Sequence, residues 1–60
     1  MFSVALDAMG GDYGPIETIE AALKIINDHG YVVYLVGEES KIYNILSGKS
    51  YDKSLIYVVN

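Results

Sequence analysis

The sequence contains no cysteine and no arginine, and it has one proline and one histidine among 60 residues. Without cysteine, these residues can form no disulfide, thiolate zinc site or cysteine nucleophile. Four lysines against eight acids give a net charge of −4, which argues against a nucleic-acid partner or a polybasic membrane patch. The longest apolar run, residues 31–36, is far shorter than the roughly 20 residues of a transmembrane helix. We therefore expect a cytoplasmic protein that binds no nucleic acid.

The chain is short for an independent domain. A domain of about 60 residues buries only about 60% of the surface that its unfolded chain exposes. The hydrophobic fraction of 52% is high for so small a body, and residues 55–60 have the pattern of a buried strand. We therefore predict that residues 1–60 are the N-terminal fragment of a single larger α/β domain, with oligomerisation as the alternative source of a covering layer.

A glycine-rich turn at residues 6–15 (LDAMGGDYGP) is the stretch in which we expect the chemistry. Gly10, Gly11 and Gly14 allow positive φ and a close approach of the backbone to a ligand. Pro15 suits the first position of a helix, whose unpaired amides attract anions. Asp7 comes at the end of an apolar strand, and ligands of open α/β sheets bind beyond the carboxyl ends of the strands.

Residues 15–29 have the periodicity of an amphipathic helix. Apolar residues recur at spacings of three and four and would form one face of the helix. Gly30 is expected to end the helix. Acids and lysines four residues apart predict ion pairs between Glu20 and Lys24 and between Lys24 and Asp28. The residues predicted to face inward are Ile16, Ile19, Leu23 and Ile26.

The remaining segments complete an alternating order. Residues 2–6 predict a central strand, and the continuous apolar run at 31–36 predicts a parallel strand covered on both faces. Residues 38–47 predict a second helix with Ile42, Ile45 and Leu46 inward, and a polar loop at 49–53 precedes the third strand. The fold class is therefore α/β, a β-α-β-α-β order with a parallel sheet and right-handed crossovers.

The sequence fits neither of two common nucleotide-binding motifs. Aligning Gly11 and Gly14 with the last two glycines of the dinucleotide fingerprint G-x-G-x-x-G puts Met9 at the first glycine, although Glu38 could serve as the acid after the second strand. Residues 48–50 (GKS) resemble the end of a phosphate-binding loop. However, Tyr43 stands where its first glycine is required, and the triplet follows a helix instead of joining a strand to one.

The polar residues of the turn admit several interpretations. Asp7 and Asp12 are candidates to ligate a hard cation, to position a substrate or to act as acid and base, and equally to cap turn and helix amides. Tyr13 is a candidate for a lid or a packing residue. His29, in the last turn of the first helix, is expected to interact with the helix dipole and not to take part in catalysis.

A family resemblance rests on residues 4–12 (VALDAMGGD), on Gly14-Pro15 followed by a helix, and on residues 35–39 (LVGEE) before Lys41-Ile42. This pattern resembles the N-terminus of the bacterial acyl-carrier-protein:phosphate acyltransferases, the PlsX family of phospholipid synthesis. The segment 56–60 resembles the family's third strand, with Asn60 where a histidine would be expected. The resemblance covers the whole chain but only about the first fifth of such an enzyme.

The resemblance implies a Rossmann-like three-layer α/β/α fold related to phosphotransacetylases and isopropylmalate-type dehydrogenases. It implies an acyltransferase that moves a fatty acyl group from acyl carrier protein to inorganic phosphate, without a cofactor or metal, in a cytoplasmic homodimer with peripheral membrane contact. The residues it assigns to substrate binding are Asp7, Gly10, Gly11 and Asp12. The fragment alone is expected to be inactive. The alternatives are a nucleotide- or dinucleotide-binding Rossmann module and a small non-enzymatic interaction module.

Overall fold

The computed structural model describes residues 2–10 and 14–60, and it confirms the predicted alternation of strands and helices. The first helix begins at Gly14, one residue before the predicted start, and the second is one residue shorter at each end than predicted. A short 3₁₀ helix, which the sequence did not predict, precedes the last strand. The elements are β1 (Ser3–Asp7), α1 (Gly14–His29), β2 (Val32–Val36), α2 (Glu39–Leu46), η1 (Lys53–Leu55) and β3 (Ile56–Val59).

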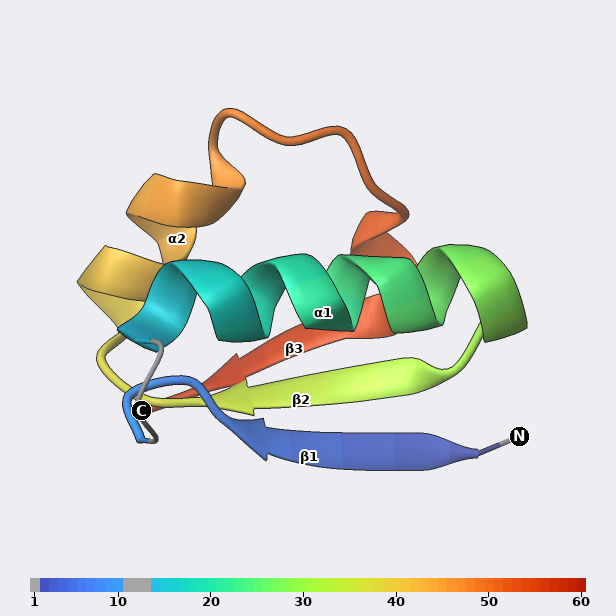
Figure 1. Ribbon diagram of the computed structural model, residues 1–60, viewed down its shortest axis with the longest axis horizontal. Coiled ribbons are helices and arrows are strands. Elements are labelled where there is room, and N and C mark those ends of the chain that lie inside the picture. Colours follow the sequence, from blue (N-terminus) through green and yellow to red (C-terminus); the bar gives the residue numbers. More distant parts are fainter. Residues whose placement is uncertain (1, 11–13) are drawn as a thin grey trace.

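The three strands form one parallel sheet in the order β1-β2-β3. Ala5 of β1 pairs with Tyr34 of β2, which pairs with Tyr57 of β3. The strands all point toward the same end of the molecule, where the turn after β1 and the C-terminus lie (Figure 1). Within the described residues β2 is central and β1 is an edge strand, so the prediction that residues 2–6 form a central strand does not hold for this sheet. The two crossover connections have the same handedness and place the strands in chain order. The continuous apolar run of β2 fits its middle position in the sheet.

Both helices lie on the same side of the sheet (Figure 1). Residues from α1, α2 and alternate strand positions form a single core between the helices and the sheet. The opposite face of β2 is not covered by the described residues, since Tyr34 and Val36 are 39% and 40% exposed. The expectation that this strand is covered on both faces is therefore met on one face only. The buried core consists of Ala8, Ile19, Ala22, Ile26, Val33, Leu35, Ile42, Leu46 and Ile56.

The inward face of α1 differs from the prediction at one position. Ile19 and Ile26 are buried as predicted, and Leu23 packs at the edge of the core. Ile16, in the first turn, is 55% exposed, because the buried stripe of the helix begins at Ile19 and Ala22 occupies its middle. Ala22 is fully buried on this face, which the periodicity of large apolar residues alone did not reveal.

The ends and ion pairs of α1 follow local rules in part. Gly30 ends the helix with φ of +69°, and its N–H donates to the Ile26 carbonyl at 2.8 Å. The predicted pair of Lys24 with Asp28 is present, with 3.2 Å between Nζ and Oδ2. Glu20 does not pair with Lys24. Its carboxylate lies 3.4 Å from the Nζ of Lys49, which joins α1 to the loop after α2.

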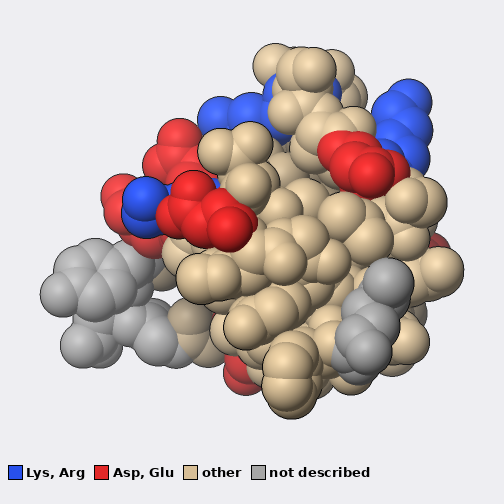
Figure 2. All heavy atoms as spheres, turned by 90° about the vertical axis from the view of Figure 1, so that its right-hand side faces the viewer, with Lys and Arg blue, Asp and Glu red and all other residues tan. Residues whose placement is uncertain are grey.

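The charged side chains visible at the amino end of the sheet gather over the helical layer, while the surface below them is almost wholly uncharged (Figure 2). Phe2 and Tyr31 lie at this end, with ring centroids 5.5 Å apart. None of the helices in the described part combines the length and the apolar character that crossing a membrane requires.

Candidate functional site

The carboxyl ends of the three strands bring separate loops into contact. The N–H of Ala8, just after β1, donates to the Val36 carbonyl at 2.8 Å, and the N–H of Gly37, just after β2, donates to the Val59 carbonyl at 2.9 Å. Ala8 is fully buried. These two bonds extend the strand pairing by one residue and hold the turn after β1 against the loop that leads into α2. This edge is where parallel α/β sheets bind ligands.

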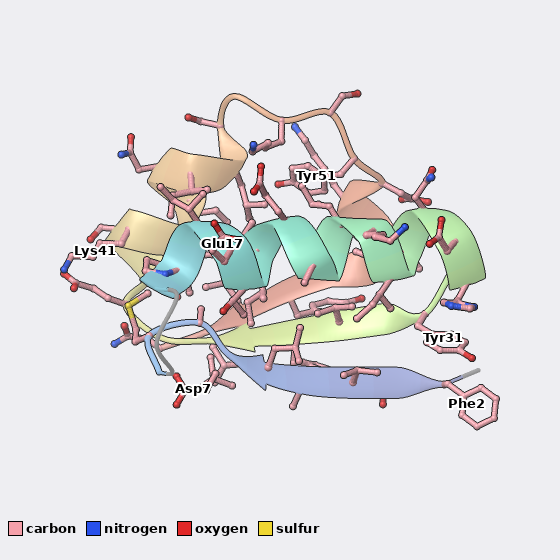
Figure 3. The ribbon with its side chains drawn as sticks, viewed as in Figure 1. Phe2, Asp7, Glu17, Tyr31, Lys41 and Tyr51 are labelled. Carbon is pink, nitrogen blue, oxygen red and sulfur yellow. The ribbon has the colours of Figure 1, made fainter. Side chains whose placement is uncertain are left out.

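Asp7 organises the turn after β1 through one carboxylate oxygen. Its Oδ1 accepts hydrogen bonds from the N–H groups of Met9 and Gly10, each at 3.0 Å. This is the local capping that aspartate commonly provides in turns. Asp7 itself is exposed and lies at the carboxyl end of β1 (Figure 3). Asp7 thus stabilises the backbone conformation of the turn that directly follows it in the sequence.

Gly10 leaves room for the same carboxylate. A Cβ added to Gly10 would lie 2.6 Å from Asp7 Oδ2 and 3.0 Å from Asp7 Cγ. Gly14, where α1 begins, has φ of +78°, a conformation that residues with a side chain rarely adopt. The predicted site residues Gly11 and Asp12, and the candidate lid residue Tyr13, lie outside the described residues.

The described groups at this edge are mostly acidic. Besides Asp7, the loop and first turn of α2 contribute Glu38 and Glu39. Lys41 of α2 has its Nζ 3.5 Å from Glu38 Oε2, so the one lysine of this helix is engaged by a carboxylate. Among residues 2–10 and 14–60, no three histidine or acidic side chains gather in a way that could hold a metal ion. An anion bound at this edge would therefore depend on cationic groups beyond those described here.

Two contacts at the edge were not anticipated from the sequence. The side-chain Oδ1 of Asn60 accepts a hydrogen bond from the N–H of Glu39 at 3.3 Å, so the residue after β3 caps the start of α2. The side chain of Met9 lies against Gly37, at a distance that leaves no room for a Cβ there. The available signal was topological, since residues directly after parallel strands meet at one edge even when they are far apart in sequence.

Other candidates lie away from this edge. Residues 48–50 follow α2 as the sequence indicated, and Lys49 is paired with Glu20. His29 stacks on Tyr31, with ring centroids 5.0 Å apart, at the amino end of the sheet. A pocket of about 230 Å³ between the second half of α1 and the loop before β3 contains none of the predicted site residues. It is lined by Leu23, Ile26, Asn27, Ser50, Tyr51, Asp52 and Leu55.

Comparison with known proteins found similarity along the entire chain. The profile of a family described as "Fatty acid synthesis protein" matches residues 2–60. A protein of Dictyoglomus thermophilum named phosphate acyltransferase is 51% identical over 57 residues, which cover 95% of this chain and 17% of the relative. No solved structure matches the chain significantly.

More distant relatives carry the same name. The phosphate acyltransferase of Aquifex aeolicus is 39% identical over 61 residues, covering 100% of this chain and 18% of the relative. That of Moritella marina is 49% identical over 49 residues, covering 80% of this chain and 14% of the relative. The chain thus spans less than a fifth of the length of these curated relatives.

Proposed function

This chain belongs to the fatty acid synthesis protein family, and from that premise we propose that it is part of a phosphate acyltransferase. In this proposal the complete enzyme transfers a fatty acyl group from acyl carrier protein to inorganic phosphate and yields an acyl phosphate for phospholipid synthesis. The observation that carries the proposal is the match over residues 2–60, which includes the glycine-rich turn held by Asp7. The relatives that match nearly all of the chain are named for this activity.

We propose further that residues 1–60 belong to a single larger α/β domain. The open face of the sheet, which bears Tyr34, Val36, Tyr57 and Val59, supports this assignment, because four apolar side chains on one face are seldom left in water. A layer supplied by another part of the complete protein would make the three-layer α/β/α arrangement that the resemblance implies. The relatives, which are more than five times longer than the matched region, have chain enough for such a layer.

The proposed reaction needs no covalent intermediate on the protein. A phosphate oxygen attacks the thioester carbonyl carbon, and the carbonyl oxygen becomes an oxyanion. The carbon–sulfur bond then breaks, so the acyl phosphate is released and the carrier thiolate takes a proton. The protein must hold phosphate and thioester together and must place hydrogen-bond donors or positive charge near the oxyanion.

We assign substrate binding to the turn that contains Asp7, Gly10, Gly11 and Asp12. Since Asp7 Oδ1 already accepts the Gly10 N–H, the role of Asp7 in this assignment is to fix the turn. The acids at this edge would repel phosphate, so the assignment requires cationic groups from elsewhere in the complete protein. In this assignment Asp12 is the acid that orients such groups. From the resemblance alone, we also propose a cytoplasmic homodimer that contacts the membrane through parts outside residues 1–60.

The direct experiment measures thiol release from an acyl-carrier-protein thioester by the full-length protein that carries these residues. Release that requires phosphate, together with an acyl phosphate trapped by hydroxylamine, is the expected result. A folded full-length protein that releases no thiol at any phosphate concentration would overturn the proposal. In that case, a rise in melting temperature with NAD or ATP would favour a nucleotide-binding module instead.

A further inference from the structure

Gly37 and Met9 meet where the ends of β1 and β2 come together. A Cβ added to Gly37 would lie 2.8 Å from Met9 Cγ, 3.0 Å from Met9 Cε and 3.3 Å from Ile42 Cδ1. The N–H of Gly37 donates to the Val59 carbonyl at 2.9 Å, which ties its backbone to the sheet. The space beside Gly37 is therefore filled by two side chains, and the backbone of Gly37 is held in place.

Of these two neighbours, Met9 would have to move if residue 37 had a side chain. Ile42 is fully buried in the core, and its contact with the added Cβ would be the longer one. Met9 is 36% exposed and has the contact below 3.0 Å. The terminal Cε can swing aside, because methionine is flexible. The Cγ is only two bonds from the backbone, so its displacement requires a new χ1 rotamer or a shift of the main chain.

A shift of the Met9 main chain would reach the proposed site directly. The N–H of Met9 donates to Asp7 Oδ1, the same atom that accepts the N–H of Gly10. Asp7, Met9 and Gly10 are thus joined through one oxygen atom, with 3.0 Å to each nitrogen. Movement of the Met9 main chain would change the geometry around that oxygen and with it the conformation of the turn.

We propose that Gly37 is a positioning residue for the turn after β1. Its missing side chain lets Met9 pack across the end of β2, and this packing sets the turn in the conformation that Asp7 caps. The inference rests on the proposed function, in which this turn binds phosphate. The inference gives a functional reason for the glycine in residues 35–39 (LVGEE). In the fold itself, Gly37 only follows the end of β2.

The test uses the full-length protein with the substitutions Gly37→Ala, Met9→Ala and both together. Gly48→Ala is the matched control, since a Cβ at Gly48 would meet nothing within 4 Å. We expect Gly37→Ala to raise the KM for phosphate about tenfold, because small displacements of a binding group are costly. We expect the double variant to return to the KM of Met9→Ala alone, and Gly48→Ala to keep the wild-type KM.

The KM for phosphate separates positioning from a loss of folded protein. A purely structural defect would lower the apparent kcat and leave this KM unchanged, which would overturn the inference. A double variant in which the two effects simply add would also overturn it, because the loss would then not pass through Met9. If Gly37→Ala alone does not fold, recovery of folding and of phosphate binding in the double variant supports the inference, and failure to recover contradicts it.

The same experiment distinguishes this inference from the proposed function. An active wild-type enzyme with an unaffected Gly37→Ala variant overturns the inference alone. A folded wild-type protein without phosphate-dependent thiol release overturns the proposed function, and the role of Gly37 in phosphate binding with it.

Discussion

The carboxylate of Asp7 occupies the space that a side chain on Gly10 would need: an added Cβ would lie 2.6 Å from Asp7 Oδ2. The other oxygen of the same carboxylate accepts the N–H groups of Met9 and Gly10. Asp7 and Gly10 therefore depend on each other. A side chain at residue 10 would displace the carboxylate from the position in which it caps the turn.

This dependence predicts that Gly10→Ala is damaging in the full-length enzyme. The methyl group would push the carboxylate away and break the bonds to Met9 and Gly10, so we expect kcat/KM to fall by about a hundredfold. The measurement is phosphate-dependent thiol release, with Gly48→Ala as the control because it adds the same methyl group in open space. Equal activities of the Gly10→Ala and Gly48→Ala enzymes would show that the turn tolerates a side chain.

Substitutions of Asp7 separate its hydrogen bonds from its charge. Asparagine retains an oxygen that can accept the N–H groups of Met9 and Gly10, whereas alanine leaves both without that acceptor. Loss of such a cap costs about 0.5–2 kcal/mol, so we expect Asp7→Ala to lower both stability and kcat/KM, and Asp7→Asn to retain activity within about threefold of the wild type.

The control for this pair is the melting temperature of each variant. An Asp7→Asn enzyme that is stable but as inactive as Asp7→Ala would show that the negative charge itself is needed. The acid would then act on cationic groups of the complete protein and not only as a cap.

Local patterns in the sequence predicted the elements well, because they depend on neighbours along the chain. The period of α1, the glycine that ends it and the apolar run of β2 each identified an element. The contacts that define the site were not predictable in this way. Asp7 and Gly10 are three residues apart and followed from the motif, but Met9 meets Gly37 only through the pairing of β1 with β2.

The dependence of local patterns on sequence neighbours also explains where the structure differs from the predictions. The apolar character of residues 2–6 predicts a central strand, yet among the three described strands β1 lies at an edge. Apolar character reports burial and does not report strand order, which long-range packing decides. The spacing of four residues predicts a pair of Glu20 with Lys24, but Glu20 pairs instead with Lys49 from the loop after α2.

The cap that Asn60 provides to α2 is a second testable contact. Its Oδ1 accepts the N–H of Glu39 at 3.3 Å on an exposed part of the surface. Asn60→Ala removes the acceptor, and we expect the free energy of unfolding to fall by about 0.5–1 kcal/mol. Urea denaturation of the full-length protein measures this change. Asn60→Asp keeps the acceptor and should lie within about 0.5 kcal/mol of the wild type; a loss equal to that of alanine would contradict the capping role.

The open face of the sheet gives the clearest test of whether residues 1–60 lie within a larger domain. Tyr34 and Tyr57 stack on this face with ring centroids 5.4 Å apart, and Tyr57 is 51% exposed. On α2, Tyr43 is 53% exposed. Tyr43 and Tyr57 thus match in residue type and exposure. Only Tyr57, however, lies on the face that we propose is covered by another layer.

We expect the isolated 60-residue chain to self-associate through this apolar face. Tyr57→Lys places a charge there, so we expect it to reduce the self-association measured by sedimentation velocity. In the full-length protein the same substitution would bury an unpaired ammonium group and should lower the free energy of unfolding by about 3 kcal/mol. Tyr43→Lys should change it by less than about 0.5 kcal/mol. If the two lysine variants were equally stable in the full-length protein, no layer would cover Tyr57, and residues 1–60 would have to be regarded as a separate module.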